Sequence, residues 1–303
     1  MKPGARWHSA TSEDNAERDD SGLGAPLLAG VARGGVLANL ILALTSGFIL
    51  LAAPFSLAQS QKTVEAFDDY IAAAEARVTR MRSKPDTFLA IDSLASEQRA
   101  SRMPRLRQGE IVIEKQGSGA SGIPSGLIHD WVGTVLIPKA TVAQVLGLVQ
   151  DYDHSTDHYS PDVMQSRLIS RHADDFTAFL RLKKHKVITV VLDTEYNIHY
   201  GRLDTTHQYS FSRSTRISEI AEPGTPNEHA LPAAKDHGFM WRLNAYWAFE
   251  QIDDGVLVEC EAISLTRDIP TGLGWMVGPF VNSIPRESLQ FTLDATRKAL
   301  ATK

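Results

Sequence analysis

Five long segments of β-type sequence follow one another from Phe176 to Arg267, and this run constrains the fold more than any other feature. The segments are rich in Val, Ile, Thr, Tyr, Phe and Trp, and turn signals such as Asp253-Asp254-Gly255 separate them. The predicted strands cover residues 176–184, 187–199, 208–220, 239–251 and 256–267. Hairpin-connected strands form an antiparallel sheet, and its apolar face needs a covering layer.

A helix predicted after Pro285 can supply that layer, because it carries an apolar face at helical spacing. The face consists of Leu289, Leu293, Thr296 and Leu300. Three further elements precede the β-type run: a short strand at 111–113, a strand over 127–137 and a helix over 141–150. We therefore predict an α+β fold in which a curved antiparallel sheet surrounds a long C-terminal helix and leaves space beside it.

The first third of the chain has a different character. Residues 34–61 contain no charged side chain, and their centre, 36–53, is mostly apolar. Arg33 before this segment, Pro54 within it and the small-residue pattern ending at Ala58 predict a signal peptide, and hence a periplasmic or secreted protein. About 20 apolar residues also suffice to span a bilayer, so an anchor formed by residues 34–53 is the alternative.

These features divide the chain into four parts. Residues 1–33 lack periodicity and are predicted to be disordered, or to result from a start codon assigned too early. Residues 34–58 are the signal peptide or anchor, residues 59–107 a helical extension, and residues 108–303 the sheet domain. The extension has an apolar stripe, and a second helix is expected from Asp86. The stripe consists of Val64, Phe67, Ile71, Ala74, Val78 and Met81. We expect it either to dock on the chain's own domain or to pair with another chain.

Composition excludes several classes of function. The net charge of −5 provides no basic field for nucleic-acid binding. The single cysteine, Cys260, excludes an internal disulfide and a multi-thiolate zinc site, and its place in a predicted strand indicates a buried, inert thiol. The sequence has no phosphate-binding loop and no Gly-x-Ser-x-Gly elbow. We predict no cofactor, and the oligomeric state is left open.

Three short passages follow the predicted helix at 141–150: Asp151-Tyr152, Tyr159-Ser160-Pro161-Asp162-Val163 and Ser166-Arg167-Leu168. With the tail segments 270–272 and 285–289, they resemble the START-like or SRPBCC superfamily, in its polyketide cyclase and coenzyme Q-binding branches. The resemblance covers residues 127–300. It implies a helix-grip fold with an apolar ligand, such as a lipid, quinone or polyketide-like compound, in its cavity. The helical extension and the export signal depart from a minimal domain of this kind.

Aromatic and charged side chains of the sheet domain are the candidate ligand-binding residues. They are Trp131, Tyr152, Tyr159, Arg213, Trp241, Arg242, Tyr246, Trp247, Glu259, Glu261 and Trp275. For Arg242, Glu259 and Glu261 two interpretations stay open: cross-strand ion pairs on a solvated face, or anchors for the polar head of a ligand. The aromatic residues are either ordinary core or the lining of a pocket.

Two other segments have alternative interpretations. His154 and His158 are four residues apart and could share a metal on one helix face, or lie in a solvated turn. Residues 272–280 are glycine-rich and apolar, and are interpreted as a lid that touches a membrane transiently, or as simple packing before the last helix.

The predicted function is an exported binding or transfer protein for a hydrophobic small molecule. The alternatives are a cyclase- or hydrolase-type enzyme that uses the same cavity, or an adaptor that assembles through the N-terminal helix. An enzyme would need an acid or base in the cavity, and the candidates are His129, His185, His199 and Glu195.

Overall fold

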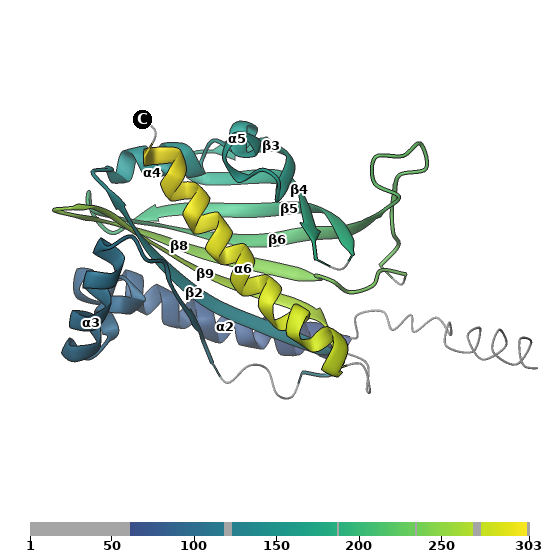
Figure 1. Cartoon of the computed structure of the whole chain (residues 1–303), viewed down its shortest axis with the longest axis horizontal. Helices are drawn as coiled ribbons and strands as arrows, with labels where there is room; N and C mark the ends of the chain where they lie inside the picture. Colours follow the sequence, from purple (N-terminus) through teal and green to yellow (C-terminus); the bar gives the residue numbers. More distant parts are fainter. Residues whose placement is uncertain (1–60, 118–122, 187, 234, 269–273, 302–303) are drawn as a thin grey trace, which may run out of the picture. The chain divides into compact units, whose positions relative to one another are not determined.

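The computed structural model describes residues 61–117, 123–186, 188–233, 235–268 and 274–301, and for residues 274–282 the backbone only (Figure 1). The predicted tail at 1–33 and the predicted signal peptide or anchor at 34–58 lie outside these residues. Among the helices that are described, none combines the length and the apolar character needed to cross a membrane.

One antiparallel sheet forms the centre of the unit Phe55–Lys303 (Figure 1). Its strands lie in the order β1-β2-β9-β8-β6-β5-β4-β3, and β7 pairs with β6 beside this path. The strands are β1 Val112–Lys115, β2 Gly126–Pro138, β3 Val163–His172, β4 Asp175–His185, β5 Thr189–Arg202, β6 His207–Ala221, β7 His229–Ala230, β8 Arg242–Ile252 and β9 Gly255–Arg267.

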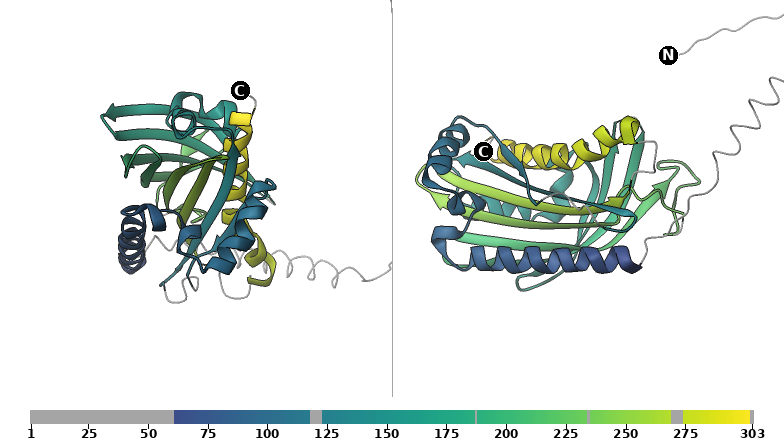
Figure 2. Two further views of the ribbon diagram at one scale, coloured as in Figure 1. Left: turned by 90° about the vertical axis from the view of Figure 1, so that its left-hand side faces the viewer. Right: turned by 90° about the horizontal axis from the view of Figure 1, so that it is seen from below.

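Helices lie on both faces of this sheet, and Figure 2 shows α6 on one side and α2 on the other. The helical elements are α2 Gln61–Arg82, η1 Pro85–Thr87, η2 Ala90–Ser93, α3 Ser96–Arg107, α4 Val142–Val149, η3 Tyr152–His154, α5 Ser155–Tyr159 and α6 Gly274–Ala301. We call the two sides the α6 face and the α2 face. The predicted α+β class is confirmed, because an antiparallel sheet holds a long C-terminal helix against one face.

On the α6 face, the C-terminal half of α6 packs closely on β2 and β9. Leu289 and Leu293 are buried against the apolar side chains of both strands. Gly133 of β2 permits this close approach, because a Cβ atom at that position would lie 2.6 Å from Leu293 Cδ1. The buried Cys260 belongs to the same cluster.

On the α2 face, the apolar stripe of α2 is buried in the chain's own core. Phe67, Ile71, Ala74 and Val78 pack against side chains of β2, β8 and β9. The segment after α2 extends this layer, because Phe88 and Leu89 are fully buried against the same sheet face. Residues 59–107 therefore neither stand apart nor cap the space beside α6; their described part, from residue 61, closes the opposite face of the sheet.

Several predicted elements differ from the structure. In place of one helix from Asp86 there are two short 3-10 turns, followed by α3. The backbone at Leu89 and at Leu94 is extended and ends regular helix on either side of η2. The final helix begins at Gly274 rather than after Pro285, so most of the predicted lid is backbone of α6, despite the low helix propensity of Gly and Pro. Sequence reasoning also missed β3 and α5, and placed the start of β8 three residues too early.

We expect Phe67→Ala to lower the free energy of unfolding by about 3–5 kcal/mol, because it leaves a cavity under α2 where the side chain is 2% exposed. Urea denaturation of the full-length chain measures this loss. Asp68→Ala changes the neighbouring exposed position and should leave the midpoint unchanged. Equal midpoints for the Phe67 and Asp68 variants would show that α2 does not pack on the sheet.

Candidate functional site

The α6 face beyond β9 carries a row of apolar side chains that are only half-buried. The strand register places Ala245 of β8 opposite Ala262 of β9, and Trp247 opposite Cys260. Leu243 continues the row along β8, and these side chains are half-buried except for Cys260. Among the described side chains, α6 packs chiefly on β2, β9, α4 and α5. The row therefore lies beside the helix rather than fully beneath it.

Two buried polar atoms on this face have no hydrogen-bond partner. They are Nε1 of Trp131, in β2, and Oγ of Ser166, in β3. Ser166 is opposite Leu180, whose side chain belongs to the cluster on the α6 face, and Trp131 packs against the cluster that contains Leu289. Buried donors are normally paired, since an unpaired one costs about 1–3 kcal/mol. Both atoms are thus available to an acceptor on a bound molecule.

Two candidate tyrosines lie near this row: Tyr152, in η3, contacts β5, and Tyr159, in α5, contacts α6. The hydroxyl groups of Tyr152 and Tyr200 are 2.8 Å apart, and the Tyr159 hydroxyl is 3.0 Å from Oγ1 of Thr296 in α6. Burial raises the pKa of Tyr152 to about 12 and also raises the pKa of Tyr159. Both side chains are therefore neutral phenols at physiological pH. Four of the candidate ligand-binding residues thus lie on the α6 face: Trp131, Tyr152, Tyr159 and Trp247.

The charged candidates of β9 lie on the opposite, α2 face. Arg82 Nη2 donates to Glu259 Oε1 at 2.9 Å, and both side chains are buried. The backbone N–H of Ala90 donates to the other oxygen of Glu259 at 2.7 Å. Arg77 forms an ion pair with Glu261. Both glutamates are therefore paired with the helical extension, and neither is part of a cross-strand pair on a solvated face.

Three other candidates also contact the extension. The Arg213 guanidinium binds both carboxylate oxygens of Glu75 in α2, at 2.5 and 2.8 Å. The Tyr246 hydroxyl donates to the same carboxylate at 3.0 Å. Trp241 is buried in the cluster beneath α2. Arg242, also a candidate, is half-buried and donates to the carbonyl oxygen of Trp241, and the side chain of Trp275 lies outside the described residues.

Two buried carboxyl groups, those of Asp130 and Glu261, lie close together on the α2 face. Asp130 of β2 accepts a hydrogen bond from the Tyr70 hydroxyl at 2.7 Å, and its other oxygen is buried without a partner. Burial, and then the nearby carboxylate of Glu261, raise the pKa of Asp130 to about 7, although Tyr70 and Arg77 act in the opposite direction. This interface is built around ionisable groups rather than a purely apolar contact.

The histidine candidates have separate local contacts. His154 pairs with Asp151 at 2.8 Å, and the ring of His158 packs edge-on against Tyr159. Within the described residues, no three metal-ligating side chains come together. His129 is buried on the α6 face with Nε2 3.0 Å from Thr266 Oγ1, and burial lowers its pKa to about 4. Of the other proposed acids and bases, His185 contacts Thr189, His199 contacts Asp175 and Glu195 contacts Arg216.

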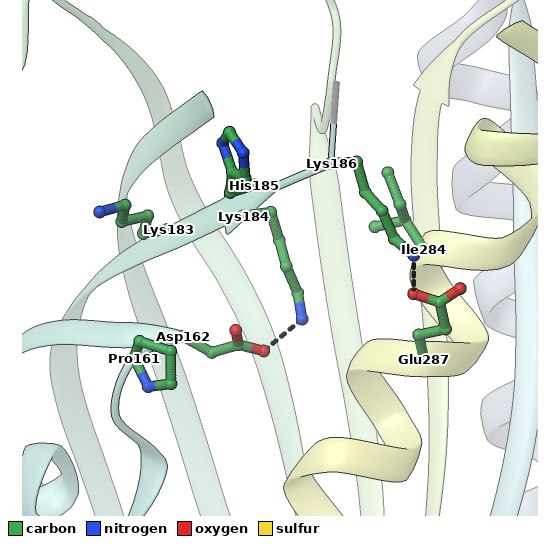
Figure 3. A pocket seen from close by; sticks show the side chains of 8 residues that line it. All are labelled: Pro161, Asp162, Lys183, Lys184, His185, Lys186, Ile284 and Glu287. Carbon is green, nitrogen blue, oxygen red and sulfur yellow. Dashed lines mark hydrogen bonds and ion pairs between the residues drawn. The ribbon is translucent and has the colours of Figure 1, made fainter. Parts of the chain in front are cut away.

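Sequence reasoning missed a pocket at the end of β4, which has a volume of about 350 Å³ (Figure 3). Three segments form its walls: the turn before β3, the end of β4 and one turn of α6. The lining residues are Pro161, Asp162, Lys183, Lys184, His185, Lys186, Ile284 and Glu287. The available signal was the run of four basic residues at 183–186.

We expect Arg82→Met to lower the free energy of unfolding by about 3–5 kcal/mol, because it leaves the buried carboxylate of Glu259 without its charged partner. The double variant Arg82→Met/Glu259→Gln should recover part of the loss, since the amide is neutral and still accepts from the N–H of Ala90. Arg105→Met breaks an exposed pair and should leave the urea midpoint unchanged. Full stability in the Arg82→Met variant would contradict a buried pair.

The stability of the chain should depend on pH through Asp130. The pKa of its carboxyl is about 7 in the folded chain, against 3.8 for an ordinary aspartate in the unfolded chain. The folded state thus binds more protons between these values, and this contribution to the free energy of unfolding falls as pH rises from about 4 to 7. His129 contributes with the opposite sign, because its pKa falls from 6.5 to about 4 on folding.

The difference between wild type and Asp130→Asn isolates the Asp130 contribution. Asparagine still accepts from Tyr70 but does not ionise, so the variant should gain stability relative to wild type between about pH 5 and pH 8. Denaturation curves across this range measure the gain, and Asp253→Asn, in an exposed turn, controls for loss of a carboxylate. If wild type and the Asp130 variant follow parallel pH profiles, Asp130 does not titrate in this range.

Comparison with known proteins finds solved structures that are similar at low sequence identity. No family model matches the chain, and no curated protein matches it. A STAR-related lipid transfer protein fragment from Xanthomonas axonopodis is 19% identical, with 61% of this chain and 98% of that chain covered, at a TM-score of 0.41. A START superfamily protein from Mycobacterium smegmatis is 12% identical, with 57% of this chain and 97% of that chain covered, at a TM-score of 0.39. The Zhui aromatase/cyclase from Streptomyces sp. R1128 is 10% identical, with 57% of this chain and 94% of that chain covered, at a TM-score of 0.40. These solved structures are START and aromatase/cyclase proteins, and each matches the chain at a TM-score below 0.5. The α+β fold of the chain, an antiparallel sheet with a long C-terminal helix, is given by its own structure.

Proposed function

We propose that the chain binds a hydrophobic small molecule between the α6 face of the sheet and α6. One observation carries the proposal: two buried polar atoms on this face, Trp131 Nε1 and Ser166 Oγ, lack partners. Trp131 lies opposite the half-buried Ala262, and Ser166 lies opposite the half-buried Leu180. Ligand sites in general combine a mostly apolar lining with a few placed polar groups.

The two kinds of group have different roles in binding. A ligand over the row of Leu243, Ala245, Trp247 and Ala262 removes apolar surface from water, at about 25 cal/mol for each Å² buried. An acceptor atom on the ligand can take a hydrogen bond from Trp131 or Ser166, which relieves the cost of an unpaired buried donor. The favoured class is therefore an apolar molecule with one or a few oxygen acceptors, such as a lipid, quinone or polyketide-like compound.

Export and membrane exchange belong to the same proposal. The sequence pattern of residues 34–58 supports export to the periplasm or secretion, with an anchor at 34–53 as the alternative. A carrier of apolar molecules in such a compartment would load or unload at a membrane through transient contact. Sequencing the N-terminus of the native protein separates cleavage after Ala58 from retention of an anchor.

Binding is better supported than the two alternatives. For an enzyme, His129 is the candidate base on the α6 face, but its low pKa makes it a weak base, and its Nε2 already contacts Thr266. For an adaptor, the centre of the apolar stripe of α2, from Phe67 to Val78, is buried against the chain's own sheet and is not available to another chain.

We expect Ala262→Phe to weaken binding of the neutral apolar dye Nile red by at least about tenfold, because the added ring fills space beside Trp131 and Ala245. Dye fluorescence, with the full-length chain, measures the affinity. Ala143→Phe adds the same ring at an exposed position of α4 and should leave the affinity unchanged. Equal affinities for the two variants would place the dye elsewhere, and failure of the wild type to bind would overturn the proposal.

A further inference from the structure

Two ion pairs border the pocket at the end of β4. Lys184 of β4 pairs with Asp162, and Lys186 Nζ pairs with Glu287 Oε2 of α6 at 2.6 Å. Figure 3 shows the two pairs on either side of the pocket, with Lys183 directed away from it. All four paired side chains are between 24% and 42% exposed, so a ligand from solvent can reach them.

Lys184 and Lys186 have N–H donors left with which to bind an anion. An ammonium group has three N–H donors, and each of the two lysines has one carboxylate partner among the described contacts. Asp162 and Glu287 fix the direction of the lysine side chains without consuming all their donors. Lys183 also borders the pocket, but its side chain is directed away from it, so Lys184 and Lys186 are the cations that can face a ligand. An oxyanion bound by Lys184 and Lys186 would form charge-assisted hydrogen bonds without breaking either pair.

A row of apolar side chains along β4 leads from the pocket onto the α6 face of the sheet. Side chains of β4 alternate between the two faces, so that Ala178, Leu180, Leu182 and Lys184 share one face. The register sets Ala178, Leu180 and Leu182 opposite Tyr196, Thr194 and Leu192 of β5. The Lys184 ammonium also lies 5.6 Å from the ring centroid of Phe291 in α6. The strand extends about 20 Å from Ala178 to Lys184. Along this length the α6 face of β4 presents apolar side chains, followed by the ammonium group of Lys184.

From this arrangement we infer that the pocket binds the anionic head of an amphiphile, a carboxylate or phosphate, whose apolar chain lies along β4 on the α6 face. This inference rests on the proposed function and specifies its substrate class. Lys184 and Lys186 hold the head, and Leu180 and Leu182 contact the chain. Neutral apolar molecules would use the same face without the head-group contact.

Calorimetry on the full-length chain tests this with four probes: dodecanoate, dodecyl phosphate, dodecanol and inorganic phosphate. We expect the two charged amphiphiles to bind at least about tenfold more tightly than dodecanol, as charge-assisted hydrogen bonds allow. Lys184→Gln/Lys186→Gln should abolish this difference and leave the affinity for dodecanol unchanged. Lys183→Gln is the matched control, because it removes a charge from the same strand but from the other face, and should retain the difference.

A further variant separates loss of the site from loss of the fold. Lys184→Gln/Asp162→Asn removes one ion pair without leaving a lone carboxylate, and should keep the wild-type melting temperature and dodecanol affinity while dodecanoate binding weakens. Equal affinity of the wild type for dodecanol and dodecanoate would overturn the head-group inference and leave the proposed function standing. Binding of none of the three chain compounds would overturn the proposed function. Inorganic phosphate binding as tightly as dodecyl phosphate would show a free-anion site and contradict an amphiphile.

Discussion

The fold depends on the pairing of two acidic side chains in the middle of the sheet. Glu259 and Glu261 lie in β9, between β2 and β8, and are almost completely buried. A buried carboxylate without a partner is strongly destabilising, and arginines of α2 supply the partners. The N-terminal extension is therefore a structural part of the sheet domain, and the sheet is not expected to be stable without it.

This constraint assigns different roles to the two faces of the sheet. The α2 face is closed by the extension, and its ionisable groups are used in holding helix and sheet together. The α6 face is left with half-buried apolar side chains, two unpaired polar atoms and a pocket with lysines at one end. Buried atoms of Arg82, Asp130 and Glu250 on the α2 face also lack a hydrogen-bond partner, but the extension covers that face. Binding chemistry is thus available on the α6 face, where half-buried side chains remain.

Much of this architecture can be predicted from sequence, because alternation with a period of two marks strands and spacings of three and four mark the stripe of α2. Alternation also separates Glu259 and Glu261 from Cys260, but it cannot say which face a helix covers. That depends on Arg77 and Arg82, which lie 184 and 177 residues before their partners Glu261 and Glu259. β3 was missed because it is an edge strand with mostly polar, exposed side chains. The β4 pocket needs three distant segments to meet, so sequence shows only its lysines.

Amide hydrogen exchange of the full-length chain, with and without dodecanoate, tests most directly whether ligand binding belongs to the α6 face. Exchange in a strand or helix slows where a ligand stabilises its hydrogen bonds. We expect slower exchange in β4, β8 and the C-terminal half of α6 when dodecanoate is bound, and unchanged exchange in α2. Protection confined to α2 and α3, with β4 and α6 unchanged, would contradict the assignment of the two faces.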